Sequence, residues 1–260
     1  MRVSRGGPNE GYVRSRVPRG GFRLETARSI QRALASRVIE EDLLNVDDVD
    51  LVSGGIDVAY INHGDAEIGI SVASTYSLAK SSIIEWSCWV GPVTFPYVPT
   101  LLSFRELKPV VNAYLRLRTR PQVVLIDGHG RAHPYRLGIA SHFGVCMRVP
   151  TIGVAKSLLY GKVDGGVEGP ILDIGTNEVI GWAIQCAPSK PTYVSVGYGI
   201  SLRSAVNLIK RLCVGSQMPI PILHSHNTAN NLKRRITKRL SERSIEELDN
   251  ECKSSMENYL

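Results

Sequence analysis

The sequence has few aromatic residues, few cysteines and no long hydrophobic run. Phe, Trp and Tyr together make up 7% of the 260 residues. The five cysteines are widely spaced, form no CxxC pair and lack the Cys/His spacing of a zinc module, which argues against a structural zinc site. We therefore expect reduced thiols, as in an intracellular protein, at Cys88, Cys146, Cys186, Cys213 and Cys252.

No apolar segment approaches the roughly 18 residues that indicate a transmembrane helix, and the N-terminus lacks the apolar stretch of a signal peptide. Residues 1–22 are rich in Arg and poor in acids, as in a transit peptide, but their glycines and prolines would interrupt an amphipathic helix. The sequence thus favours a soluble cytoplasmic protein without a membrane partner, and we expect a monomer.

The net charge of +7 is concentrated near the two ends of the chain. Residues 1–23 carry +5 and residues 232–243 also carry +5, whereas residues 244–260 carry −4. The intervening residues 24–231 carry only +1. Basic flanks of this kind can hold a phosphate backbone without reading its sequence, so the charge indicates a nucleic-acid partner but no particular chemistry.

The spacing of apolar residues predicts the secondary structure. Helices are expected at residues 24–44, 105–118, 136–144 and 201–212. Strands are expected at residues 51–61, 66–74, 82–90, 123–126, 149–154, 171–174, 179–184 and 193–196. Because the first three strands follow one another directly and the later ones alternate with helices, we expect an α/β fold. Its mixed sheet would begin as an antiparallel meander and continue with parallel strands, with helices on both faces.

Composition and pattern together divide the chain into three parts. Residues 1–22 should be a flexible basic arm, and residues 23–231 should form the main folded domain. Residues 232–260 alternate charges densely enough to be a solvated helix or a frayed tail.

Three carboxylates are candidates for a metal site. Asp57 lies in the middle of a predicted buried strand, where a carboxylate is costly unless it is paired or metal-bound. Asp127 ends another strand, where α/β folds bind ligands, and Glu106 begins the second helix. Taken singly, they could be a salt-bridged or edge-strand Asp, a turn-capping Asp and an acid at a helix N-terminus. Together they form the oxygen-rich ligand set that Mg²⁺ prefers.

Basic side chains lie close to these acids in the sequence. His129 and His133 are four residues apart, but Gly130 and Pro134 argue against the helix that a zinc pair would need. We expect these histidines to line a phosphate pocket instead. Lys156 follows a predicted buried strand, where it could neutralise a phosphate or simply be solvated, and the segment around it lacks the glycines of a P-loop.

Three segments resemble motifs of the endonuclease V family: PYVPTLLSFRE at residues 96–106, DGHGRAHP at 127–134 and PTIGVAKS at 150–157. The resemblance extends over about residues 24–215. It implies a ribonuclease H-like fold and hydrolysis of nucleic acid that contains deaminated bases, with Mg²⁺ as cofactor and Mn²⁺ as a substitute. The cut would fall at the second phosphodiester bond 3′ to deoxyinosine in DNA.

The resemblance also implies roles for individual residues. Asp57, Glu106 and Asp127 match the metal-binding acids of the family, Lys156 matches its active-site lysine, and Tyr97 matches the aromatic wedge that separates the strands. The pocket around the flipped base, by the same resemblance, includes Pro99, Leu102, Gly130, His133, Gly138 and Gly153. It assigns no definite role to His129.

The sequence departs from the family pattern at three places. Thr100 replaces the glycine that usually follows the wedge, which would tighten the pocket. Tyr198 stands where the family usually has a histidine near the metal, so we expect one metal position to be weakened or filled by water. The C-terminal motif is blurred at Pro221–Ala229, and no function is assigned to that stretch.

Three other functions remain open at this point. An inosine-specific endoribonuclease would share all of these residues, and a non-cleaving binder of deaminated nucleic acid would fit the changes at Thr100 and Tyr198. A nuclease of other specificity, such as a junction resolvase, is disfavoured by the wedge motif. The intact acids argue against the binder.

Overall fold

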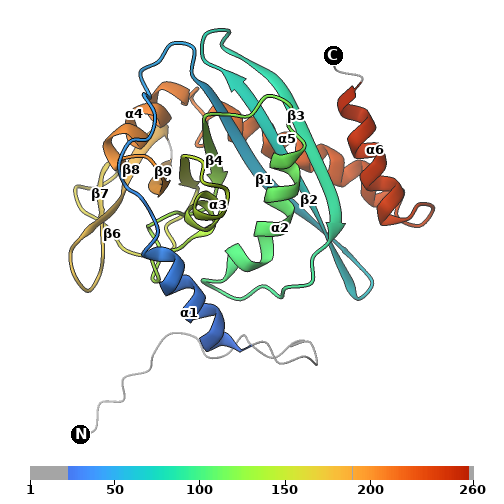
Figure 1. Ribbon diagram of the computed structural model, residues 1–260, viewed down its shortest axis with the longest axis horizontal. Coiled ribbons are helices and arrows are strands. Elements are labelled where there is room, and N and C mark those ends of the chain that lie inside the picture. Colours follow the sequence, from blue (N-terminus) through green and yellow to red (C-terminus); the bar gives the residue numbers. More distant parts are fainter. Residues whose placement is uncertain (1–22, 189, 258–260) are drawn as a thin grey trace, which may run out of the picture.

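The structure is a computed structural model that describes residues 23–188 and 190–257. Nine strands form one sheet in the order β3-β2-β1-β4-β5-β9-β8-β7-β6 (Figure 1). The strands are β1 (Val52–His63), β2 (Ala66–Ser77), β3 (Ser82–Pro92), β4 (Val123–Asp127), β5 (Thr151–Ala155), β6 (Lys162–Val163), β7 (Gly169–Leu172), β8 (Val179–Ala187) and β9 (Lys190–Tyr198). The helices are α1 (Leu24–Ala35), α2 (Leu102–Leu115), α3 (Ile139–Met147), α4 (Leu202–Leu212), α5 (Ile220–Thr237) and α6 (Ile245–Glu257).

The sheet is mixed, as the sequence predicts. Strands β1, β2 and β3 form an antiparallel meander, and β4 and β5 then add in parallel to β1. The remaining strands, β9 to β6, are antiparallel to their neighbours. The parallel pairs matter for function because they bring the C-terminal end of β4 beside the middle of β1, where Asp57 lies.

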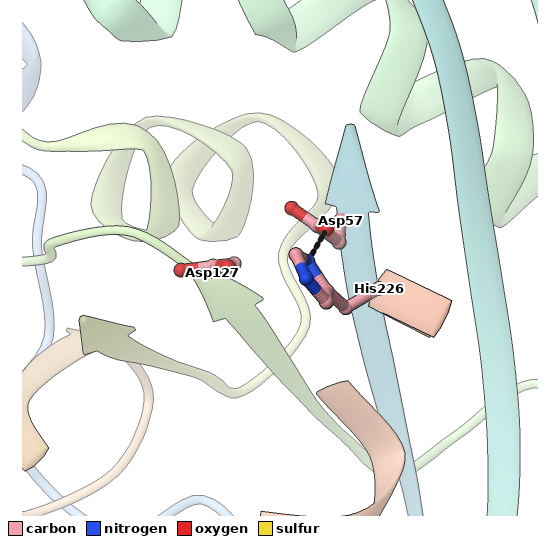
Figure 2. Close-up of side chains that lie close together, drawn as sticks. All are labelled: Asp57, Asp127 and His226. Carbon is pink, nitrogen blue, oxygen red and sulfur yellow. Dashed lines mark hydrogen bonds and ion pairs between the residues drawn. The ribbon is translucent and has the colours of Figure 1, made fainter. Parts of the chain in front are cut away.

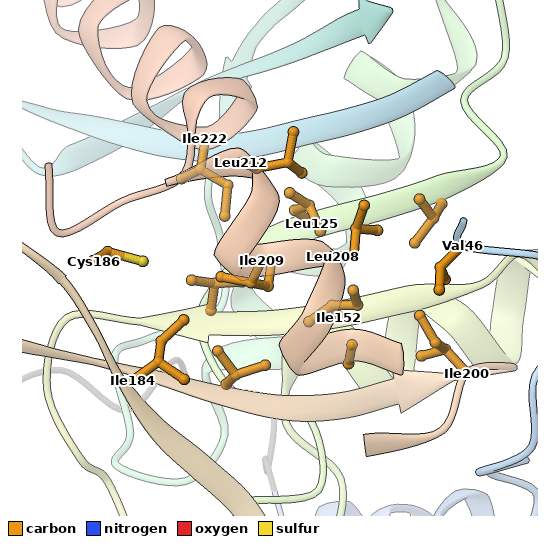
Figure 3. Packing of buried hydrophobic residues seen from close by; sticks show 14 of the residues in the cluster. Val46, Leu125, Ile152, Ile184, Cys186, Ile200, Leu208, Ile209, Leu212 and Ile222 are labelled. Atoms are coloured by element: carbon orange, nitrogen blue, oxygen red, sulfur yellow. The ribbon is translucent and has the colours of Figure 1, made fainter. Parts of the chain in front are cut away.

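Helices cover both faces of the sheet, and β4 shows how its sequence produces this. Successive side chains of a strand point to opposite faces. Leu125 packs with residues of α4 and α5 on one face (Figure 3), whereas Val124 and Ile126 pack with residues of α2 and α3 on the other. A short strand buried on both faces is therefore apolar at every position, as residues 123–126 are.

The C-terminal part of the chain packs on the sheet instead of extending into solvent. Helix α5 runs across residue 231, the expected end of the main folded domain, and α6 lies beside β3 (Figure 1). Arg116, after α2, binds Asp249 of α6 with two hydrogen bonds of 2.7 Å each. Leu248 and Cys252 are buried in the same apolar cluster as Ile70 of β2. Residues 232–257 are thus mostly helical, as one of the two alternatives expected, but one side of these helices packs on the sheet.

Two further expectations were wrong. The first helix ends at Ala35, because the backbone of the following segment bonds to the turn after β9: Leu43 N–H donates to the Gly199 carbonyl, and Gly199 N–H donates to that of Ile39. All five cysteines were expected to be reduced, but disulfides join Cys88 to Cys252 and Cys186 to Cys213, and Cys146 alone is a free thiol. The Cα atoms of the two pairs lie 5.9 and 5.2 Å apart, within the range that a disulfide spans.

The basic arm expected at residues 1–22 lies outside the described residues. Within the described part of the chain, no helix has both the length and the apolarity needed to cross a membrane.

Candidate active site

Asp57 and Asp127 lie side by side because of the parallel pairing of their strands. Ile56 of β1 is opposite Ile126 of β4, and the next residue on each strand is one of the two aspartates (Figure 2). Burial raises the pKa of Asp127, and the nearby charge of Asp57 raises it further. Two adjacent, largely buried carboxylates repel each other unless a cation lies between them.

His226 of α5 completes this group, and the sequence analysis missed it. Its Nδ1 lies 2.7 Å from Asp57 Oδ2, and one ligand atom from each of Asp57, Asp127 and His226 lies within 4.8 Å of the others (Figure 2). Asn230, one turn along α5, lies 3.2 Å from the Nε2 atom of His226. In the neutral ring, a hydrogen bond from Asn230 to Nε2 places the ring proton on Nδ1, facing Asp57.

A close approach between α5 and β1 brings His226 to the aspartates. A Cβ atom on Gly55 would lie 2.2 Å from the carbonyl carbon of Pro221, so only glycine lets the helix come this near. Ser225 Oγ then donates a hydrogen bond of 2.8 Å to the Gly55 carbonyl. Pro221 lies in the first turn of α5, where proline costs no hydrogen bond. Two features of the sequence bear on this contact. The glycine pair Gly54-Gly55 of β1 permits the close approach, and the helix that makes it begins in the stretch Pro221–Ala229, to which no function was assigned.

Glu106 lies near the two aspartates but outside the cluster that they form with His226 among the described residues. Burial raises the pKa of Glu106 to about 8, and the charges of Asp57 and Asp127 add to the rise. A hydrogen bond of 2.5 Å from the Tyr60 hydroxyl acts in the opposite direction and lowers this pKa. Its role as a metal ligand stays a prediction.

Lys156 places a positive charge directly beside these acids. It follows β5, and its Nζ lies 2.9 Å from Asp127 Oδ2 and 3.5 Å from His226 Nδ1. The lysine is thus part of the site and is not a solvated side chain remote from it. It is 38% exposed, so it can also reach an incoming phosphate.

A cavity of about 380 Å³ opens next to Asp127 and Lys156. Its lining includes three residues expected at a base pocket, namely Leu102, His133 and Gly138, together with His129. The segment from Tyr97 to Thr100, called here the wedge loop, lies at the cavity. The Tyr97 side chain is 70% exposed, so it is not a core residue.

Three other residues expected at the pocket are not part of this lining, as far as the described residues go. They are Pro99, Gly130 and Gly153. A Cβ atom on Gly153 would lie 2.3 Å from Gly130 N, and one on Gly130 would lie 2.0 Å from the Val196 carbonyl oxygen. These glycines allow backbones to pack behind the cavity and do not face it.

Of the two histidines in the loop after β4, His133 is buried and His129 is half-buried. Burial lowers the pKa of both His129 and His133 to about 4. His133 Nε2 lies 3.0 Å from the Thr100 carbonyl oxygen, and its Nδ1 accepts a hydrogen bond from the Tyr135 N–H. A neutral ring with both nitrogens engaged contributes shape and no charge to the cavity.

Tyr198 has a different place from the one expected. It pairs with Thr151, the first residue of β5, whereas Asp127 pairs with Val154 near the other end of that strand. Tyr198 therefore does not replace a histidine near a metal. The histidine of this site is His226, from the stretch to which no function was assigned.

Comparisons with known proteins agree with this geometry. A sequence model of the family Endonuclease V matches residues 32–227. The endonuclease V of Thermofilum pendens is 41% identical over 207 residues, which cover 79% of this chain and 87% of that protein. That of Gloeobacter violaceus is 36% identical over 211 residues, covering 79% and 85%.

Solved structures match the fold as well. The endonuclease V of Streptomyces avermitilis superimposes with a TM-score of 0.75 and 32% identity, over 85% of this chain and 98% of that one. The endonuclease V of Ciona intestinalis, in complex with a 24mer DNA that contains an inosine followed by a ribo-adenosine, gives a TM-score of 0.75 and 29% identity over 82% and 98%. The expected ribonuclease H-like fold is thereby confirmed. The chain belongs to the endonuclease V family and is a nuclease.

Proposed function

We propose that the protein is a metal-dependent endonuclease that cleaves DNA at the second phosphodiester bond 3′ to deoxyinosine. The observation that carries the proposal is the position of Asp57, Asp127 and His226 beside a cavity bordered by an exposed tyrosine. The inosine-containing DNA bound to the Ciona intestinalis relative supports the choice of substrate.

The residues present fit a divalent cation. Two carboxylate oxygens and one imidazole nitrogen form a compact donor set, and the acids around it are poorly neutralised by Lys156 alone. When bound, Mg²⁺ or Mn²⁺ polarises the scissile phosphate and lowers the pKa of a water molecule. Asp57, Asp127 and His226 would hold the cation, with Glu106 as a further acid of the site.

The other residues would bind and orient the strand. Lys156 would neutralise charge on the scissile phosphate, which lowers the barrier most where water is excluded. Tyr97 would stack in the gap left by the extruded base and so offset part of the cost of unstacking. The extruded base would enter the cavity lined by Leu102, His133 and Gly138.

RNA is the second candidate substrate. The DNA in the Ciona intestinalis complex carries a ribo-adenosine after its inosine, so that relative binds a ribonucleotide at this position. An inosine-specific endoribonuclease would use the same acids and the same cavity.

Matched oligonucleotides test the proposal. Labelled DNA and RNA strands with inosine or adenosine at one position are incubated with Mg²⁺, with Mn²⁺ and with chelator, and the products are sized at single-nucleotide resolution. We expect metal-dependent cleavage one nucleotide beyond inosine, and loss of cleavage in Asp57→Asn. Equal cleavage of inosine and adenosine strands, or cleavage in chelator, would refute the assignment.

A further inference from the structure

We propose that Gln31 of α1 is a positioning residue for the wedge loop and acts through the carbonyl group of Thr100. This inference rests on the proposed function, because it concerns how the loop that carries Tyr97 is held. Gln31 itself neither touches the cavity nor belongs to the metal-binding cluster.

The Gln31 side chain is fully buried and ties three segments together. Its Nε2 donates hydrogen bonds to the carbonyls of Thr100, at 2.7 Å, and Leu137, at 3.4 Å. Its Oε1 has no hydrogen-bond partner among the described residues. A buried acceptor without a hydrogen bond costs desolvation free energy, so this side chain contributes little to the stability of the fold. Gln31 is therefore better explained by the loop that it holds than by the core in which it lies.

Thr100 is the residue that needs to be held. Its φ is +71°, in the left-handed region that glycine adopts freely and threonine does not. Its carbonyl oxygen is held by two donors, Gln31 Nε2 and His133 Nε2. The His133 ring is fixed in turn, because its Nδ1 accepts the Tyr135 N–H, which leaves Nε2 as the donor. Two rigid donors thus compensate for the missing glycine.

The tether fixes the loop at one end of the wedge. Leu101 N–H donates to the Val98 carbonyl at 2.9 Å and closes the turn that presents Tyr97 to solvent. The same end of the turn continues into α2, which begins at Leu102. If the Thr100 carbonyl is released, its backbone can leave the left-handed region, and Tyr97 loses its fixed direction.

A double-mutant cycle tests the inference with four proteins: wild type, Gln31→Met, Thr100→Gly and the double variant. Gln31→Met keeps the volume of the side chain but removes its donor. We expect KM for inosine DNA to rise roughly two- to tenfold, the worth of one neutral hydrogen bond, with kcat nearly unchanged. In the Thr100→Gly background the same exchange should have a smaller effect, since glycine holds a positive φ without help.

Hydrogen exchange gives a readout that needs no substrate. The Leu101 amide, bonded to Val98, should exchange faster in Gln31→Met, while amides of β4 keep their protection. Gln122→Met is the control, because it makes the same exchange at another glutamine whose side chain hydrogen-bonds to the backbone. The Gln122 Oε1 atom accepts a hydrogen bond of 2.8 Å from the Val52 N–H at the start of β1, away from the site. This variant should change neither KM nor the exchange of Leu101.

The possible outcomes separate the two proposals. A wild type that does not discriminate inosine contradicts the proposed function, whereas the Leu101 exchange still tests the tether. Unchanged KM and unchanged Leu101 exchange in Gln31→Met would overturn the inference. So would an equal rise in KM in both Thr100 backgrounds, or a fall in melting temperature with unchanged KM in the folded fraction.

Discussion

At the scale of single residues, the site depends on how four charged or ionisable side chains share a small volume. Asp57 and Asp127 are adjacent on neighbouring strands, and Lys156 and His226 approach them from other elements. His226 contacts Asp57 directly, and this hydrogen bond raises the pKa of the histidine. Asp57 and His226 would help to hold a metal ion, and the imidazole nitrogen that binds it would have to be free of its proton.

His226→Ala should therefore reduce metal-dependent cleavage by at least roughly 100-fold, since outer-sphere partners of a metal are already worth about 10–100-fold. Binding of an inosine oligonucleotide in chelator should be nearly unchanged. The measurement is cleavage over a titration of Mg²⁺ and Mn²⁺. Asn230→Ala, which only loses the contact that orients His226, should show a smaller loss. Near-wild-type cleavage by His226→Ala would exclude the histidine from the site.

At the scale of elements, the wedge loop is an exposed turn on a rigid support. Tyr97 is 70% exposed, yet the turn behind it is fixed through Thr100 and the start of α2. An exposed aromatic ring on a fixed turn suits stacking between bases better than packing.

Tyr97→Ala should weaken binding of inosine DNA by about 1–3 kcal/mol, the usual worth of stacking a base on an aromatic ring. Tyr97→Phe should bind almost as well as wild type, because it keeps the ring. Affinity for inosine and adenosine duplexes and the melting temperature are measured on the same protein. A core tyrosine would instead cost roughly 3–5 kcal/mol of folding stability on truncation, so a large fall in melting temperature with discrimination intact would contradict the wedge role.

The two disulfides act on elements as well, because each fixes a helical segment to a strand. Cys252 fixes α6 to Cys88 of β3, far apart in the sequence, and Cys213 follows α4 and bonds to Cys186 of β8. Cys252→Ala should lower the free energy of unfolding by about 2–4 kcal/mol, and reductant should lower the melting temperature of the wild type. Cys146→Ala is the control, since Cys146 is a free, exposed thiol. A melting temperature that reductant leaves unchanged would show that the thiols are not paired.

At the scale of the whole molecule, buried histidines link folding to pH. Burial lowers the pKa of His129, His133 and His142 to about 4, whereas an exposed histidine titrates near 6.5. Between these values the unfolded chain binds more protons, so stability contributed by these residues falls as the pH drops from 6.5 towards 4. Glu106 has the opposite effect on stability. Its pKa is about 8 in the folded protein and about 4.3 in an unfolded chain, so between these values the folded protein binds more protons and its stability rises as the pH falls.

His142→Phe isolates one of these contributions. His142 is 5% exposed and lies edge-on to Phe104, 5.3 Å between ring centroids, so a phenyl ring is a close replacement. Relative to this variant, the wild type should lose on the order of 2 kcal/mol of stability between pH 7 and pH 4.5. Chemical unfolding of both proteins at a series of pH values measures the difference. A difference that does not vary with pH would mean that His142 titrates normally in the folded protein.

The sequence by itself determined the parts of this protein that depend on local pattern. Alternation and apolar runs placed β1 to β5 and α2 to α4 within a few residues, and the strand positions of Asp57 and Asp127 predicted that the two acids would meet. The motif around Tyr97 indicated an aromatic side chain outside the core, and its side chain is exposed.

Only the tertiary structure decided the parts that depend on contacts between distant segments. His226 reaches Asp57 across 169 positions of the sequence, and Gln31 reaches Thr100 across 69. Gly55 permits a close approach but does not identify the helix that makes it, because a polar helix such as α5 looks like a surface helix until its first turn packs against that glycine. The same is true of α6 and of the disulfides. Local propensity is set by a few neighbouring residues, whereas burial and side-chain pairing are set by which surfaces the folded chain brings together.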